Sequence, residues 1–281
     1  MTPLTDKKML QLLFFGDIVG RVGRKAVETY LSSRLPEPVD IVIANVENAS
    51  HGFGLTEKHY YELNRMGIHI MTGGNHSLDR KETHQFIESA PYLLRPANFF
   101  TGTPGCGAKV YDIAGFKIAV LNLIGQVFMG NYNSPWEYLD EWVPQLLNET
   151  PIVFVDLHAE TTAEKICMAR YAATLGVSAM VGTHTHVQTA DERILNHRMG
   201  YITDVGFNGG YDSVIGMDPT SSLNKMRSHS PTRLEVSECQ TVQVNAVRFE
   251  IEAATGVCIQ VQRVMDVFSL ANTDLSTSIG R

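Results

Sequence analysis

Seven short apolar runs are the feature of this 281-residue chain that most restricts its fold. None exceeds eight residues, and most are rich in valine or isoleucine and apolar on both faces, which is typical of strands that helices cover on both sides. Helix-like stretches separate several of the runs, and this alternation predicts an α/β sandwich. The expected strands are 9–15, 40–46, 67–71, 116–123, 151–157, 178–182 and 200–205, and the expected helices are 21–34, 56–66, 79–90, 135–147 and 161–175.

Two regions interrupt the alternation, and we expect them to be loop-rich insertions in a single domain that spans residues 1–281. They are residues 96–133 and 206–240, and they are expected to border a substrate pocket, because long loops beside strand ends often carry specificity. Within the first, "AKVYDIAGFKIAV" has the pattern of a hairpin. After the second, residues 241–252 and 256–267 alternate polar and apolar side chains, which predicts an antiparallel pair with one face in solvent.

The net charge of −7 argues against a protein that binds nucleic-acid phosphates non-specifically, because such binding needs a basic surface. It is compatible with a small phosphorylated substrate that metal ions hold. The four cysteines form no Cys-x-x-Cys pair, so we expect reduced thiols and a cytoplasmic protein. No run approaches the ~20 apolar residues of a membrane span. We therefore expect neither a membrane nor a stable nucleic-acid partner, and a homo-oligomer stays open.

Polar side chains follow five of the predicted strands, at the point where each strand ends. Ligands gather at this edge of open α/β sheets, so these side chains are expected to lie close together. Carboxylates, amide oxygens and imidazoles without a thiolate suit manganese, iron or zinc. The seven candidate metal ligands are Asp17, Glu47, Asn48, Asn75, His158, His184 and His186. Seven exceed what one ion needs, so two ions are predicted to share them, with Glu47 as the bridge.

Each candidate also has a purely structural interpretation. Asp17 could cap the helix at 21–34, the Glu47–Asn48 pair could be turn residues, and the histidines could lie in the core or in solvent. The joint occurrence of all of them at strand ends favours the metal interpretation. Of the remaining histidines, only His51 lies close enough to Glu47 in the sequence to be predicted to touch a substrate.

Longer motifs resemble a known family. The segments "FGDIVGRVGR", "GGNHSLD" and "VGTHTHVQTADERIL" are similar to the metallophosphoesterase superfamily and, with "VENASHGFGLTEK", to the bacterial YmdB-type phosphodiesterases. The resemblance runs from about residue 10 to residue 268. Two departures from the broader superfamily, Val19 in place of histidine and the Glu47–Asn48 pair in place of aspartate, are shared by the narrower group. Leu78 stands where that group is expected to have a larger aromatic residue, which affects the shape of the substrate pocket.

The resemblance implies a four-layer α/β/β/α sandwich with two metal ions, iron or manganese, that hydrolyses phosphodiesters including 2′,3′-cyclic nucleotides. It implies that His76 is the acid/base group near the phosphate. Our hypothesis for the mechanism is that a hydroxide held by the metals attacks phosphorus and that His76 is the general acid for the leaving oxygen. Asp156 and Asp204 are further candidates that would orient the histidines. The implied ligands are Asp17, Glu47, Asn48 and His186 for one ion, and Glu47, Asn75, His158 and His184 for the other.

Two other functions compete with this one. A phosphomonoesterase or 5′-nucleotidase could use the same metals. Alternatively, the chain could be a metal-stabilised regulatory scaffold without turnover. The spare imidazole of His76 argues against a scaffold, because a scaffold has no need of an acid that binds no metal.

Overall fold

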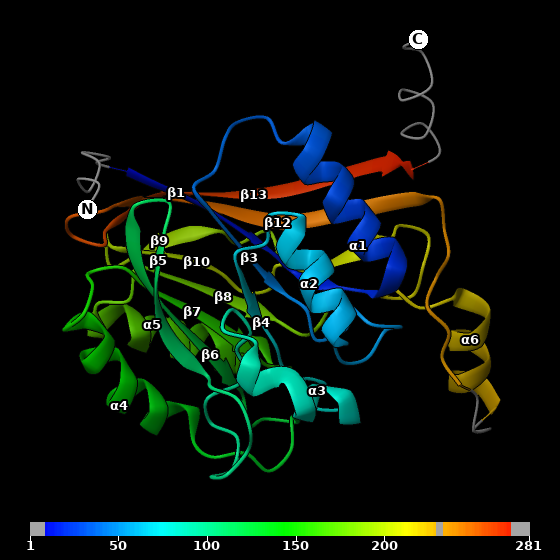
Figure 1. Cartoon of the computed structure of the whole chain (residues 1–281), viewed down its shortest axis with the longest axis horizontal. Coiled ribbons are helices and arrows are strands. Elements are labelled where there is room, and N and C mark those ends of the chain that lie inside the picture. The colour runs from blue at the N-terminus through cyan, green and yellow to red at the C-terminus, as the bar shows by residue number, and fades with distance from the viewer. Residues whose placement is uncertain (1–8, 229–232, 271–281) are drawn as a thin grey trace.

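The computed structural model describes residues 9–228 and 233–270. Two β-sheets pack face to face, and helices cover both outer faces (Figure 1). This arrangement confirms the predicted four-layer α/β/β/α sandwich. The described part contains no helix that is both long and apolar enough to cross a membrane.

The first sheet has seven strands in the order β2-β11-β12-β1-β3-β4, with β13 also paired to β12. The strands are β1 (Met9–Phe15), β2 (Asp17–Ile18), β3 (Ile41–Asn45), β4 (Ile70–Thr72), β11 (Phe207–Gly210), β12 (Thr241–Glu252) and β13 (Cys258–Ser269). β1, β3 and β4 run parallel, so their carboxyl ends meet at one edge of the sheet.

The second sheet has six strands in the order β5-β6-β7-β8-β10-β9. They are β5 (Ala108–Ile113), β6 (Phe116–Ile124), β7 (Val153–His158), β8 (Ala179–Thr183), β9 (Arg193–Leu195) and β10 (Met199–Ile202). β5 and β6 form the predicted hairpin, and β6, β7, β8 and β10 are parallel.

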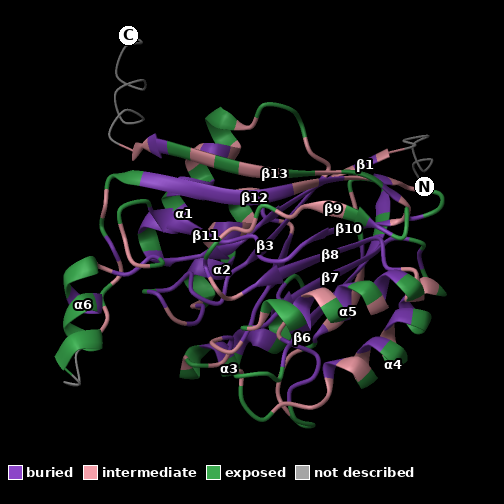
Figure 2. Ribbon diagram, turned by 180° about the vertical axis from the view of Figure 1, so that it is seen from behind, coloured by how far each residue is buried: buried purple, intermediate pink, exposed green. Residues whose placement is uncertain are grey.

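Helices cover the outer face of each sheet. α1 (Gly20–Thr29), α2 (Glu57–Arg65) and α3 (Lys81–Phe86) lie on the first sheet, and α4 (Pro135–Leu147) and α5 (Thr162–Leu175) lie on the second. Short turns of π- and 3₁₀-helix, η1 (Tyr30–Arg34) and η2 (Ile87–Ser89), follow α1 and α3. α6 (Pro219–Ser228) stands apart from the sandwich and is largely exposed (Figure 2).

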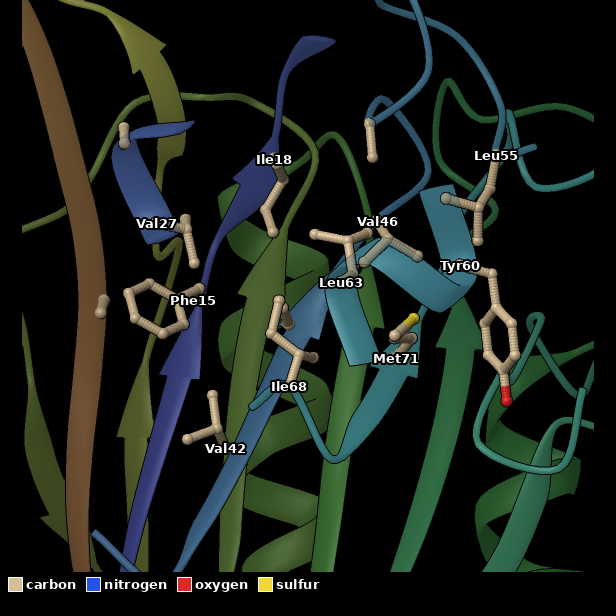
Figure 3. Close-up of a cluster of buried hydrophobic side chains, with 14 of the residues drawn as sticks. Phe15, Ile18, Val27, Val42, Val46, Leu55, Tyr60, Leu63, Ile68 and Met71 are labelled. Carbon is tan, nitrogen blue, oxygen red and sulfur yellow. The ribbon is translucent and has the colours of Figure 1, made fainter. Parts of the chain in front are cut away.

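Buried apolar side chains hold the layers together. Figure 3 shows part of the cluster between the first sheet and its helices, where Phe15 and Val42 from the strands meet Val27 and Leu63 from α1 and α2. A second cluster fills the space between the two sheets, and a third lies under α4 and α5. Thr56 caps α2 as expected, because its hydroxyl accepts a hydrogen bond from His59 N at 3.3 Å.

The predicted antiparallel pair at 241–252 and 256–267 forms, but the expectation of one wet face is wrong for its first strand. β12 is buried on both sides: Val244 belongs to the cluster under the helices, and Phe249 belongs to the cluster between the sheets. β12 is central because β1 and β11 as well as β13 pair with it. The exposed face belongs to the neighbouring strand β13 (Figure 2).

Candidate metal centre

The seven predicted ligands lie together where the two sheets meet. The chain reaches them from the carboxyl ends of four parallel strands and from the start of β2. Asp17 begins β2, Glu47 and Asn48 follow β3, Asn75 follows β4, His158 ends β7, and His184 and His186 follow β8. Glu47, Asp17 and His158 are almost completely buried, whereas His184 is partly exposed.

Four of the seven side chains meet at His158 Nε2. This nitrogen lies 3.0 Å from Asn75 Oδ1, 3.1 Å from Glu47 Oε1 and 3.0 Å from His184 Nδ1. Ligand atoms of Glu47, His158 and His184 fall within 4.8 Å of one another, which is a spacing that one metal ion can span.

A second group lies beside the first. His186 Nε2 is 3.3 Å from Asn48 Oδ1 and 3.8 Å from Asp17 Oδ1. Asp17 Oδ1 is buried and has no hydrogen-bond partner among the described residues, and it lies 4.0 Å from His158 Nδ1. The amide of Asn48 is held with its oxygen toward the group, because its nitrogen donates to Gly52 O at 2.9 Å.

Outward hydrogen bonds fix which nitrogen of each histidine faces the cluster. His158 Nδ1 lies 2.9 Å from Thr183 Oγ1, whose own hydrogen is given to Asp156 Oδ1 at 2.8 Å, so His158 Nδ1 must be the donor. His186 Nδ1 donates to Ile215 O at 2.8 Å.

The same pattern holds for His184, whose Nε2 lies 3.1 Å from Glu160 Oε2. In the neutral form of each histidine, therefore, the nitrogen that carries a lone pair points inward. The carboxylate and amide oxygens opposite these nitrogens are acceptors as well. A cation would satisfy all of these atoms at once, and this donor set fits a metal ion.

Burial and the mutual charges of the cluster shift the pKa values of its members in different directions. Burial lowers the pKa of His158, but the carboxylates of Glu47 and Asp17 outweigh it and raise that pKa to about 9. Burial raises the pKa of Glu47, but the nearby His158 outweighs it and brings that pKa to about 2. Burial and the neighbouring His158 lower the pKa of His184 to about 3. A positive charge in the middle of the cluster is therefore favoured, and a metal ion would compete there with a proton.

Close backbone approach and strain occur at this site. A Cβ atom on Gly74 would overlap the His158 ring and the Glu47 carboxylate, so only glycine fits before Asn75. His184 and His186 have positive φ angles of 105° and 62°, which non-glycine residues rarely adopt. Such strain persists only where the surroundings enforce it, and it commonly marks functional sites.

His76 lies beside the cluster. Its backbone N donates to Glu47 Oε2 at 2.8 Å, which ties its turn to a predicted ligand. Its ring Nδ1 lies 2.6 Å from Asp79 Oδ2, and the edge of the ring meets the ring of Phe53 at a centroid distance of 4.9 Å. Nε2 makes no hydrogen bond within residues 9–228 and 233–270, so it is free to meet a substrate.

The two aspartates that we expect to orient the histidines, Asp156 and Asp204, both make contacts beside the cluster. Asp156 reaches His158 through Thr183, and Thr72 Oγ1 donates to the same carboxylate at 2.5 Å. Asp204 accepts from Thr185 N at 3.1 Å and from Thr185 Oγ1 at 2.8 Å, which braces the residue between His184 and His186.

Sequence reasoning missed three residues that position these groups. They are Asp79, Thr183 and Lys165, whose buried ammonium lies 2.6 Å from Asp204 Oδ2. Asp79 follows His76 by three residues, and this spacing could have suggested the contact. Thr183 lies opposite His158 in the β7–β8 register, which is not visible in the sequence.

Within the described residues, the predicted substrate residue His51 makes no hydrogen bond to the cluster, and its ring contacts that of His59. Its exposed ring lines a separate cavity of about 780 Å³ with residues of α1 and α2, among them Arg24 and Lys58. None of the seven predicted ligands lines that cavity.

Several known proteins resemble this chain. A family model described as YmdB-like protein matches residues 13–264. The 2′,3′-cyclic-nucleotide 2′-phosphodiesterase of Bacillus subtilis (strain 168) is 40% identical over 257 residues, which are 91% of this chain and 97% of that protein.

Two solved structures are similar over nearly their whole length. A phosphatase from Mycoplasma pneumoniae has a TM-score of 0.86 at 34% identity, and the match covers 93% of this chain and 94% of that one. A hypothetical protein from Thermus thermophilus has a TM-score of 0.84 at 33% identity, with coverage of 92% and 99%.

Proposed function

Since this chain belongs to the YmdB-like protein family, we propose that it is a dinuclear metal-dependent phosphodiesterase that hydrolyses 2′,3′-cyclic nucleotides. The curated relative from Bacillus subtilis carries that activity in its name, and the alignment covers nearly all of both chains. The chain is a phosphoesterase, and the proposal adds its substrate, its metals and the roles of its residues.

The observation that carries the proposal is the inward direction of the histidine nitrogens. His158, His184 and His186 each have one nitrogen occupied by an outward hydrogen bond, so their lone pairs converge with buried oxygens. Two adjacent groups result, and we assign one ion to each, with Glu47 between them. The nitrogen and oxygen donors, without thiolate, suit iron or manganese.

The ions, when bound, would offset the negative charge of the phosphodiester and supply an activated water. The chain's own residues do the rest. His76 donates a proton from Nε2 to the leaving oxygen, because this is the nitrogen left free by the contact with Asp79. Asp79 orients the ring and stabilises it while it is charged. The hydrogen bond from His76 N to Glu47 Oε2 holds the backbone of His76 at a fixed position beside the predicted ligands.

The test compares diester with monoester hydrolysis. Enzyme loaded with manganese is expected to hydrolyse bis-p-nitrophenyl phosphate faster than p-nitrophenyl phosphate, and to open 2′,3′-cyclic AMP. A faster rate on the monoester would instead indicate a phosphomonoesterase or 5′-nucleotidase. No turnover of any of the three by metal-loaded enzyme would support the scaffold and overturn the proposal.

A further inference from the structure

A cavity of about 380 Å³ lies beside the turn that carries His76, and its lining is largely aromatic and apolar. Its walls include Leu78, Phe99, Phe100, Pro104 and Tyr132. We propose that this cavity is a nucleobase subsite, in which the base of a cyclic nucleotide stacks while the phosphate lies at the metal centre. This inference rests on the proposed function, in which the metal ligands account for the phosphate but not for the nucleobase.

The chain connects this cavity directly to the catalytic groups. Leu78 is the second residue after His76, in the same turn. The segment that leads to Tyr132 begins beside His158, where Gly125 N donates to His158 O at 2.9 Å. Both Leu78 and Tyr132 are therefore close in the sequence to residues that are fixed at the proposed catalytic site.

A buried asparagine fixes the aromatic walls to the end of β6. Asn98 Nδ2 donates to Ile124 O and to Asn133 O, both at 2.8 Å, and Asn98 Oδ1 accepts from Ile124 N at 2.9 Å. Ile124 lies opposite His158 in the β6–β7 register. Phe99 and Tyr132, the neighbours of Asn98 and Asn133 in the sequence, are thus held at a constant place relative to the site.

Phe99 is buried and supports the partly exposed ring of Tyr132, which is a ring of the kind that stacks on bases. Phe99 and Tyr132 are stacked with centroids 5.3 Å apart and an angle of 14° between their planes. The guanidinium of Arg95 lies 5.9 Å from the centroid of Phe99 and adds a cation–π contact to the pair. Phe100, which is 58% exposed, adds a third aromatic ring to the lining of the cavity.

The reaction places the nucleoside on this side of the site. Hydrolysis of a 2′,3′-cyclic phosphate adds the oxygen of water to phosphorus and breaks one bond from phosphorus to a ribose oxygen. That ribose oxygen receives its proton from His76, so the ribose and its base must lie next to this residue. The cavity that Leu78 lines is therefore placed to receive the base.

Electrostatics agree with this placement. Burial, followed by the carboxylates of Glu47 and Asp79, raises the pKa of Tyr132, which places the phenol within their field and keeps it neutral. A neutral ring can approach an anionic substrate without repulsion.

Stacking, rather than hydrogen bonding to base edges, is expected to dominate recognition. Two of the polar side chains that line the cavity are already engaged with the backbone: Thr103 Oγ1 donates to Phe100 O at 2.6 Å, and His84 Nε2 lies 3.1 Å from Leu78 O. Because every base has a π-face, a stacking subsite tolerates different bases. We therefore expect purine and pyrimidine cyclic nucleotides both to be substrates.

The test uses Tyr132→Ala and two substrates that differ in the base. For 2′,3′-cyclic AMP, kcat/KM is expected to fall by about fivefold to a hundredfold, which is the range for loss of one stacked base. For methyl p-nitrophenyl phosphate, which has no nucleobase, the rate is expected to stay within about twofold of that of the unmodified enzyme. Tyr132→Phe should retain the ring and the activity on both substrates.

A matched control and a binding measurement separate this effect from a folding defect. Tyr61→Ala removes a half-exposed tyrosine from α2 and should change neither rate. In saturation-transfer NMR with adenosine and metal-free protein, the base protons should receive saturation in the wild type and lose most of it in Tyr132→Ala.

The outcomes distinguish the subsite from the proposed function. The subsite is overturned if Tyr132→Ala loses rate equally on both substrates, or if its kinetics and its adenosine saturation stay unchanged. In either case the protein remains a phosphodiesterase. If the wild type hydrolyses neither substrate, the proposed function is wrong. If, in addition, the base protons of adenosine receive no saturation from the wild type, the subsite is wrong as well.

Discussion

His76 differs from the other imidazoles of the site in what its nitrogens touch. The three predicted histidine ligands point a lone pair into the cluster, whereas His76 has Nδ1 against Asp79 and keeps Nε2 free within the described residues. Only its backbone contacts a predicted ligand, Glu47. This division agrees with a proton-transfer role for His76.

His76→Ala tests that role through the leaving group. On 2′,3′-cyclic AMP, where a ribose alkoxide must be protonated, kcat is expected to fall by about 10²- to 10⁴-fold. On bis-p-nitrophenyl phosphate, whose leaving group is stable as an anion, the loss should be much smaller. Metal content should stay unchanged. Parallel rate measurements check this, with His197→Ala as a control, and a full rate of His76→Ala on the cyclic nucleotide would show that another group supplies the proton.

At the level of residues, sequence could place the candidate ligands but not their partners. Glu47 and His158 are visible because each marks the end of an apolar run, and parallel strands end at a common edge. The contact of Thr183 with His158 depends on strand register, and the contact of Asp79 depends on how the 74–79 turn folds. The prediction for His51 depended only on its proximity to Glu47 in the sequence, and its ring lines a cavity that none of the seven predicted ligands lines.

Among the elements, the segment after β8 has a strained backbone that neighbouring side chains must stabilise. It carries two histidines with positive φ, and Asp204 holds the residue between them. Asp204 in turn pairs with Lys165 from α5, and both side chains are almost completely buried. Helix α5 therefore stabilises a strained loop that the proposed metals require.

Lys165→Met tests this support. The substitution leaves the carboxylate of Asp204 buried without its cation, so the free energy of unfolding is expected to fall by about 3–5 kcal/mol. Urea unfolding measures the change. The control is Lys117→Met, because Lys117 forms an exposed ion pair with Glu149 at 3.9 Å, and its loss should cost less than about 1 kcal/mol. Equal effects of the two substitutions would contradict the proposed support.

Helices and strands whose sequence shows a clear hydrophobic period or capping residues were predictable. Features that depend on neighbouring elements in the fold were not. Helix α4 was predicted to the residue, because Ser134 and Pro135 mark its start. The strand expected at 67–71 begins only at Ile70, since Gly67 adopts a positive φ of 100° in the turn after α2. The burial of β12 on both faces follows from its central place in the sheet, which its alternating sequence does not reveal.

For the whole molecule, the important feature is that the site belongs to both sheets. Glu47 and Asn75 follow strands of the first sheet, and His158 and His184 end or follow strands of the second. The sheets also share one apolar cluster, so we propose that they form a single domain. One thermal unfolding transition, seen alike by far-UV circular dichroism and intrinsic fluorescence, is the expected result; two separate transitions would show that the sheets unfold independently.

The metal content of the purified chain tests the central proposal most directly. After loading with manganese and removal of free ions, elemental analysis is expected to give about two ions per chain. Glu47→Gln should lower this number, because the proposed bridge loses its charge, while the exposed Glu149→Gln should not. A wild-type chain that retains no metal, or a Glu47→Gln chain that retains as much as the wild type, would contradict the assignment of these residues to a dinuclear centre.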